Sequence, residues 1–84
     1  MSEAGTLRIQ VRLFGTVRRF SMPETPGLWQ GTVNRGSTIR DVLRIMGIEE
    51  REVSSATLNG VLCPFDEKVA DGATVVLVTP MGGG

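Results

Sequence analysis

Apolar and polar residues alternate strictly near the start of the chain. From Thr6 to Phe14 every second residue is apolar, and arginine or glutamine falls between most of them. The apolar set is Leu7, Ile9, Val11 and Leu13. A period of two is typical of a strand with one buried face and one open face. We therefore expect a half-buried strand over residues 6–14.

A second segment with period two runs from Leu28 to Arg35 and predicts another strand. Gly31 interrupts its apolar side, and a glycine inside a strand favours a bulge or a weak edge. Between the two strands, residues 15–27 hold two prolines and two glycines. That composition is typical of a long connection, and we expect a helical turn near residues 17–20.

The best-marked element is a helix that begins after Thr38. Thr38 can cap it. Asp41 stands three residues later, where its carboxylate can accept a hydrogen bond from the Thr38 amide and interact favourably with the helix dipole. Gly47 follows the last turn of this helix, where a residue with a left-handed backbone conformation commonly ends a helix. The apolar stripe, at positions i, i+3, i+4 and i+7, consists of Ile39, Val42, Leu43 and Met46.

The period returns to two in the last third of the chain. Segments 55–59 and 61–64 flank Asn59-Gly60, a dipeptide that favours a tight hairpin because both residues accept positive φ. Residues 65–72 are mostly polar and predict a connection. Residues 73–79 are apolar at consecutive positions, which is typical of a central strand.

The order of these elements has one simple packing solution. A single amphipathic helix covers one face of a small sheet, and the apolar last strand lies in the middle, parallel to the first strand. We predict an α+β fold, a ubiquitin-like β-grasp with a four- to five-stranded mixed sheet on one main helix. The helix face and sheet should share one core that includes Ile9, Val11, Leu13, Val42, Leu43, Met46 and Leu58.

The opposite face of the sheet has no cover in this arrangement. Either Val76 and Val78 or Val75 and Leu77 must point to it. An apolar outer face on so small a domain indicates a partner surface, although an unused, mildly apolar face is the alternative. Phe14 and Phe65 are further candidates for this surface, with Pro80 at its margin.

Length and composition exclude several classes of function. The 84 residues suit one domain, 1–84, and nine basic residues balance nine acidic ones, so we expect neither a nucleic-acid nor a membrane partner. Histidine and tyrosine are absent, which removes the usual nucleophile pairs and zinc ligands, and we expect no metal site. The lone Cys63 is expected to be structural and leaves the cytoplasm as the default location.

The sequence ends in Met81-Gly82-Gly83-Gly84. Glycine has no Cβ and orders at a high entropic cost, so we expect residues 81–84 to form a flexible C-terminal tail. Such a tail can thread into a narrow slot, and its terminal carboxylate is then the candidate reactive group. A frayed or artificial end is the alternative.

Several segments together resemble a known family. They are 11–15 (VRLFG), 36–43 (GSTIRDVL), 58–60 (LNG) and 71–75 (DGATV), followed by the terminal glycines. Their order and spacing are similar to those of the MoaD/ThiS sulfur carriers, which include the small subunit of molybdopterin synthase and the carrier for the thiamin thiazole ring. The resemblance extends from about Leu7 to Gly84.

The resemblance implies a function in which the chain is a co-substrate and not an enzyme. A ubiquitin-activating-like adenylyltransferase would use ATP to adenylate Gly84, and a sulfur source would convert the adenylate to a thiocarboxylate. A synthase subunit would then accept the sulfur for molybdopterin or thiamin synthesis. Met81, Gly82 and Gly83 would pass through the partners' tunnels, and the carrier itself would bind no cofactor.

Two alternatives remain open at this stage. The chain could be a ubiquitin-like modifier that is conjugated to proteins through Gly84, or a β-grasp interaction module with inert glycines. The ending also departs from the family, which usually has two terminal glycines where this chain has three.

Overall fold

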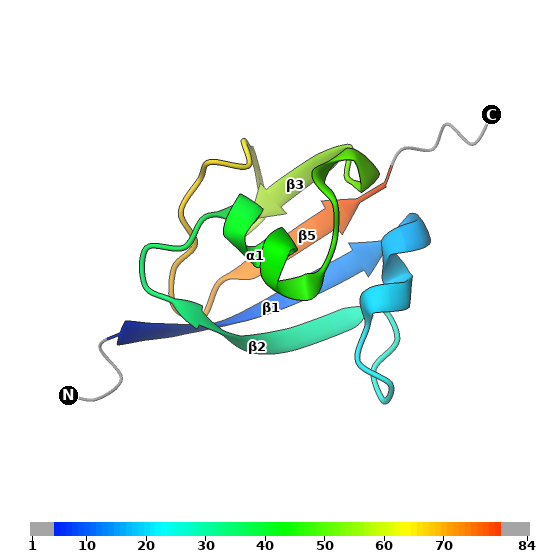
Figure 1. The fold of residues 1–84 in the computed structure, drawn as a ribbon, viewed down its shortest axis with the longest axis horizontal. Coiled ribbons are helices and arrows are strands. Elements are labelled where there is room, and N and C mark those ends of the chain that lie inside the picture. Colours follow the sequence, from blue (N-terminus) through cyan, green and yellow to red (C-terminus); the bar gives the residue numbers. More distant parts are fainter. Residues whose placement is uncertain (1–4, 80–84) are drawn as a thin grey trace.

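The computed structural model describes residues 5–79, which form a twisted sheet with one main helix across it (Figure 1). The strands are β1 (Thr6–Phe14), β2 (Leu28–Asn34), β3 (Ser55–Leu58), β4 (Val61–Cys63) and β5 (Thr74–Val78). The helices are α1 (Ile39–Met46) and the 3₁₀ helices η2 (Gly15–Phe20) and η3 (Glu50–Glu52).

The sheet has the strand order β2-β1-β5-β3-β4. β1 and β5 pair in parallel, with Val11 beside Val75 and Leu13 beside Leu77, whereas the other neighbouring strands are antiparallel. The last strand is therefore central, and α1 lies over one face of the sheet (Figure 1). This confirms the predicted mixed sheet and β-grasp arrangement.

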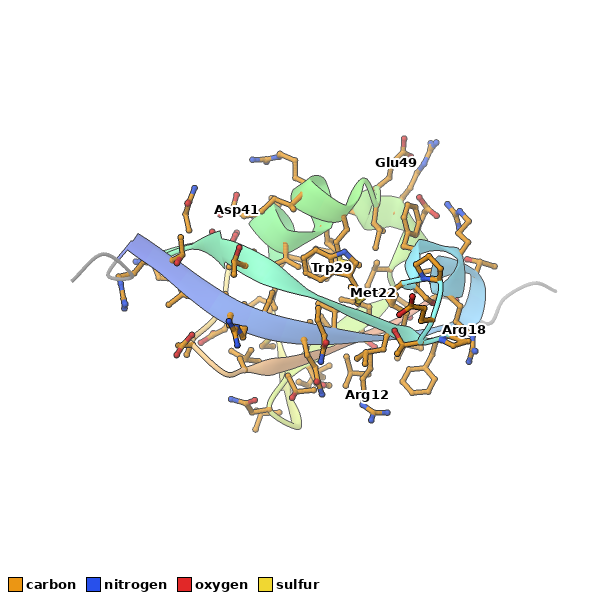
Figure 2. All side chains as sticks on the ribbon, turned by 90° about the horizontal axis from the view of Figure 1, so that it is seen from below. Arg12, Arg18, Met22, Trp29, Asp41 and Glu49 are labelled. Atoms are coloured by element: carbon orange, nitrogen blue, oxygen red, sulfur yellow. The ribbon has the colours of Figure 1, made fainter. Side chains whose placement is uncertain are left out.

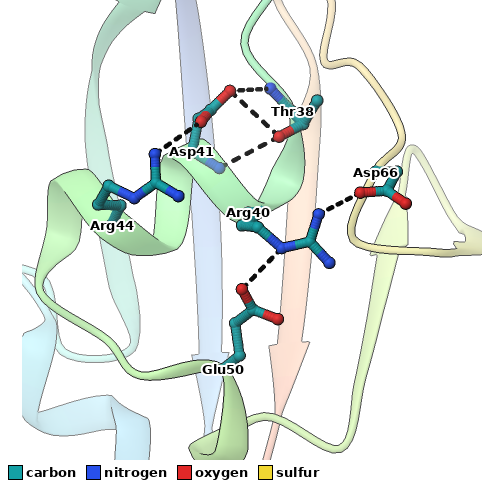
Figure 3. Close-up of polar contacts among 6 residues, drawn as sticks. All are labelled: Thr38, Arg40, Asp41, Arg44, Glu50 and Asp66. Carbon is teal, nitrogen blue, oxygen red and sulfur yellow. Dashed lines mark hydrogen bonds and ion pairs between the residues drawn. The ribbon is translucent and has the colours of Figure 1, made fainter.

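α1 begins at the predicted capping box. The Asp41 amide donates to Thr38 Oγ1 at 3.2 Å, and the Thr38 amide donates to Asp41 Oδ2 at 3.0 Å (Figure 3). The helix ends at Gly47, whose φ of 85° is left-handed, and the Ile48 amide donates to the Leu43 carbonyl at 2.9 Å. Residues close in sequence thus provide hydrogen-bond partners at both helix ends for amides and carbonyls that have none within the helix.

One apolar core lies between α1 and the sheet. Val75 and Leu77 are fully buried in it. Of the two alternatives for β5, this pair faces the core, and Val76 and Val78 point to the other face. The predicted core residues of β1 and α1 belong to this cluster, and Met46 and Leu58 pack against it while partly buried.

The predicted hairpin is confirmed. Leu58 pairs with Val61 across the turn, and Asn59 and Gly60 both have positive φ, 52° and 89°. These are the signs of φ that a two-residue hairpin loop needs to match the twist of its strands.

Of the two outcomes expected from Gly31, a bulge or a weak edge, the structure shows the edge: β2 is the outermost strand and has no bulge. Its register with β1 is continuous, and Gly31 lies opposite Ile9. Gly31 leaves room for the Trp29 ring, since a Cβ there would lie 2.6 Å from it and the indole would have to shift. Figure 2 shows Trp29 between the helix and the sheet, where its indole packs at the edge of the core.

Ion pairs on the surface connect α1 to η3 and to the loop that follows β4. The Arg40 guanidinium donates to Glu50 Oε2 at 2.7 Å and also to Asp66 (Figure 3). Both hydrogen bonds raise the pKa of Arg40, with the contact to Asp66 first. Glu50 belongs to η3, so this short helix contacts α1.

Candidate functional site

β5 is held on both sides where it ends. Thr79, the last described residue, is only 4% exposed. Its Oγ1 accepts the Thr16 amide at 3.1 Å and donates to the Phe14 carbonyl at 3.4 Å. On the other side, the Ser54 amide donates to the Val78 carbonyl at 2.8 Å. The point at which the chain leaves the sheet is therefore fixed between β1 and β3.

Gly15 makes this close approach possible. Its φ is +81°, and a Cβ at this position would lie 1.8 Å from Thr79 Oγ1. Only glycine combines this backbone conformation with room for the threonine hydroxyl. The contact joins the start of η2 to the end of β5, 64 positions later in the chain.

The expected reactive tail lies outside the described residues. This applies to Gly84, to Met81, Gly82 and Gly83, and to Pro80 at the margin of the expected surface. The last residue before this tail that the structure describes is Thr79, and it is anchored by the contacts given above.

Four apolar side chains form a patch on the face of the sheet away from α1. We call it the open-face patch: Phe14, Leu62, Val76 and Val78. Phe14 stands beside Val78 in the register of β1 and β5, and Thr57 stands between Val76 and Leu62. Phe14 is 46% exposed and Leu62 70%. The patch reaches the end of β5, so it adjoins the point where the chain leaves the sheet.

Arg12 borders the open-face patch. It pairs with Val76 on one side and with Leu28 on the other, and Figure 2 shows it on the face opposite α1. The alternation in residues 6–14 predicts that Arg12 lies on the polar side of its strand, but it does not connect Arg12 or Leu62 with this surface. β4 is apolar at all three positions, so only the register between the strands shows that Leu62 and Arg12 share a face.

The expected place of Phe65 on the open face is wrong. Phe65 is partly buried and packs against the core cluster on the helix side. Its carbonyl accepts the Arg40 amide at 2.9 Å. Because residues 65–72 cross to the start of α1 and do not follow β4 along the sheet, this aromatic ring fills the edge of the core.

Cys63 lies away from the end of β5. It pairs with Ala56, which in turn pairs with Leu77, so two strand spacings, about 10 Å, separate it from the last strand. Burial, followed by the charge of Glu67, raises the pKa of its thiol. A raised pKa lowers the thiolate fraction, which fits a structural residue.

Arg19 stabilises the segment next to the anchor. Its guanidinium donates to the Thr16 carbonyl at 2.9 Å, pairs with Glu52 and stacks 4.5 Å from the centre of the Phe20 ring. The pair lowers the pKa of Glu52. These contacts hold η2 against η3, and with it the backbone amide of Thr16 that binds Thr79.

Two further observations concern residues 5–79 alone. No group of three acidic or cysteine side chains among them is arranged to hold a metal ion. None of the helices in this part of the chain has the length and apolar character needed to cross a bilayer.

A comparison with protein families decides the relationship. The sequence model of the ThiS family matches residues 11–84, which extends from β1 through the terminal glycines. The chain belongs to the ThiS family. This confirms the resemblance to the MoaD/ThiS sulfur carriers and their ubiquitin-like β-grasp fold.

Solved structures show the same fold at low sequence identity. The HVO 2177 protein of Haloferax volcanii is 23% identical, with a TM-score of 0.73 over 95% of this chain and 89% of that one. SAMP1 of Haloferax volcanii is 20% identical, with a TM-score of 0.70 over 92% and 99%. A putative molybdopterin converting factor, subunit 1, of Pyrococcus furiosus is 18% identical, with a TM-score of 0.66 over 89% and 99%. A search of curated proteins found no match.

Proposed function

We propose that this member of the ThiS family carries sulfur as a thiocarboxylate on Gly84. The observation that carries the proposal is the family match, which includes the terminal glycines. The anchored end of β5 supports it, because a reactive tail needs a fixed point of departure. Thr79 and Gly15 form such a point next to the open-face patch.

The chemistry needs two steps outside the carrier. A carboxylate is a poor acyl donor, so a ubiquitin-activating-like adenylyltransferase transfers AMP from ATP to Gly84 and releases pyrophosphate. Hydrosulfide, or a donor that delivers sulfur at that oxidation level, then attacks the acyl carbon; the bond to AMP breaks, one proton is lost, and a thiocarboxylate remains. The carrier has no histidine and contributes presentation and docking in place of acid–base chemistry. It is a co-substrate of its partners and binds no cofactor itself.

The open-face patch is the proposed docking surface for these partners. Phe14 and Leu62 offer exposed apolar area, and an aromatic anchor surrounded by neutral contacts is typical of binding hot spots. Arg12 at its border favours a carboxylate on the facing surface. Because the patch adjoins the end of β5, a partner bound there receives residues 80–84 directly.

The sulfur acceptor in the proposal is the synthase subunit of molybdopterin synthesis, ahead of the thiazole pathway. The opening strand and the chain length favour the former, and the similarity to the Pyrococcus furiosus converting factor subunit agrees with it. We expect the reaction to take place in the cytoplasm, where ATP is available to the activating enzyme. The third glycine moves the reactive carbon outward by up to ~3.5 Å, so a partner tunnel must accommodate one more residue.

Intact mass spectrometry tests the proposal. With its activating enzyme, ATP and a sulfur donor, the chain should gain the mass difference of one oxygen replaced by sulfur, on Gly84. Removal of Gly83 and Gly84 should abolish the product and leave the fold intact, and Cys63→Ser should have almost no effect. If the truncated chain still forms the product but the Cys63 variant does not, the reactive group is the thiol of Cys63 and not Gly84. Removal of Gly84 alone tests whether the third glycine is needed.

The second candidate function is a ubiquitin-like modifier. The similarity to SAMP1 of Haloferax volcanii favours it, since the full name of that protein is small archaeal modifier protein 1. Conjugates that resist reduction and boiling would support it. Full activity of a chain that lacks residues 81–84 would instead indicate an interaction module whose terminal glycines are inert.

A further inference from the structure

The chain has a single side-chain amine, that of Lys68. The other eight of its nine basic residues are arginines. An acyl adenylate reacts with amines, and the guanidinium of arginine stays protonated and is a poor nucleophile. A chain that becomes an acyl adenylate therefore offers other copies of itself one ε-amine.

Lys68 is presented by a rigid backbone. The carbonyl of Glu67 accepts the Ile39 amide at 3.0 Å, and the Val69 amide donates to the Ser37 carbonyl at 2.9 Å. Val69 is buried, 5% exposed, whereas Lys68 is exposed. Among the described residues no carboxylate within ion-pair distance holds its ammonium group. The amine is thus displayed from a backbone that is fixed to the start of α1.

The backbone of Lys68 lies beside the start of α1, away from the end of β5 where the tail begins. Lys68 forms a bridge with Thr38 next to the start of α1, whereas Thr79 follows the far end of β5 (Figure 1). β5 alone spans about 16 Å, and residues 80–84 reach at most ~17 Å when fully extended. To reach its own Lys68, the chain would have to turn back along the whole sheet and around to the helix side.

We propose that Lys68 is an acceptor site for the activated Gly84 of a second copy of this chain. The inference rests on the proposed activation of Gly84. The amine attacks the acyl carbon, a C–N bond forms, the bond to AMP breaks, and the amine loses a proton to solvent. Each copy has one donor carboxyl and one side-chain acceptor, so the product is an unbranched head-to-tail series with uniform Gly84–Lys68 linkages.

Two complementary variants test the assignment. The donor is full-length Lys68→Arg, which keeps the charge and has no ε-amine; the acceptor ends at Pro80 and keeps Lys68. Mixed with the activating enzyme of the same organism and ATP, without a sulfur donor, they should form one dimer, whose linkage peptide mapping locates at Lys68. Each variant alone should form none. The unmodified chain should form a ladder, and the neighbouring Glu67→Gln variant should form the same ladder.

A trapping experiment with hydroxylamine distinguishes a failure of the Lys68 assignment from a failure of the proposed activation of Gly84. Hydroxylamine traps an activated Gly84 as a hydroxamate, which intact mass spectrometry detects. A hydroxamate without a dimer, or a dimer joined through the α-amine of Met1, would overturn the role of Lys68 alone. The absence of a hydroxamate would overturn both the proposed function and this acceptor.

Discussion

Gly15 and Thr79 are in direct contact where the first and last strands end. The hydroxyl oxygen of Thr79 occupies space that a side chain at position 15 would need, 1.8 Å from where its Cβ would stand. The same oxygen accepts the amide of Thr16. A residue near the start of the chain thus determines where the last strand ends and, with it, where the proposed reactive tail begins.

Gly15→Ala should destabilise the protein and lower the yield of thiocarboxylate. The methyl group displaces Thr79, and the left-handed backbone adds strain of about 1–3 kcal/mol. Gly36→Ala is the matched control, because Gly36 has a φ of +91° with nothing within 4 Å of its Cβ position. Urea unfolding should show the larger loss for Gly15→Ala. Equal losses for the two variants would mean that the contact with Thr79 is unimportant.

Leu43→Ala should lower the free energy of unfolding by about 2–5 kcal/mol, because it leaves a cavity in a fully packed core. The side chain of Leu43 is 1% exposed. Ile45→Ala, on the same helix but 54% exposed, should change stability little. Denaturant midpoints measure both. An unchanged midpoint for Leu43→Ala would contradict the packing of α1 on the sheet.

Phe14→Ser should weaken binding of the activating enzyme at least tenfold, since it removes the aromatic ring of the open-face patch. The melting temperature should change little because the ring is 46% exposed. Met22→Ser is the control, as Met22 is 37% exposed and lies outside the patch. Isothermal titration calorimetry compares the variants. Equal affinities would exclude the patch as the docking surface.

Arg12→Glu should slow association with the same enzyme, and the effect should decrease as salt screens the charge. Arg44→Glu reverses a charge on the helix side and should have a smaller effect on the association rate. Stopped-flow measurements at several salt concentrations test this. A rate for Arg12→Glu that does not depend on salt would show that no acidic partner surface faces Arg12.

Acid should remove the contribution of the capping box to stability. Hydrogen bonds from the Thr38 amide and then its hydroxyl hold the pKa of Asp41 below the ordinary value of an aspartate. A group with a lowered folded pKa stabilises the fold above its unfolded pKa and loses that contribution as the pH falls through the folded value. The stability difference between the parent and Asp41→Asn should therefore be constant above about pH 5 and shrink below pH 4. Urea midpoints across this range measure it, and a difference independent of pH would contradict the assignment.

The fold could be predicted largely because its signals are local. The period of two around Val11, the pair Thr38 and Asp41 and the dipeptide Asn59-Gly60 each act over a few residues, and the structure confirms all three. The candidate reactive group, Gly84, was also indicated by sequence alone, through the terminal glycines and the family resemblance.

Sequence by itself determined the elements and their order and indicated Gly84 as the candidate reactive group, because backbone propensity and side-chain type are properties of neighbouring residues. Tertiary structure alone decided that Val76 faces outward with Phe14 and Leu62, that Phe65 turns into the core, and that Gly15 meets Thr79. The physical reason is the register between strands far apart in sequence. Packing of one helix against five strands selects that register, and a shift of one residue would exchange the two faces.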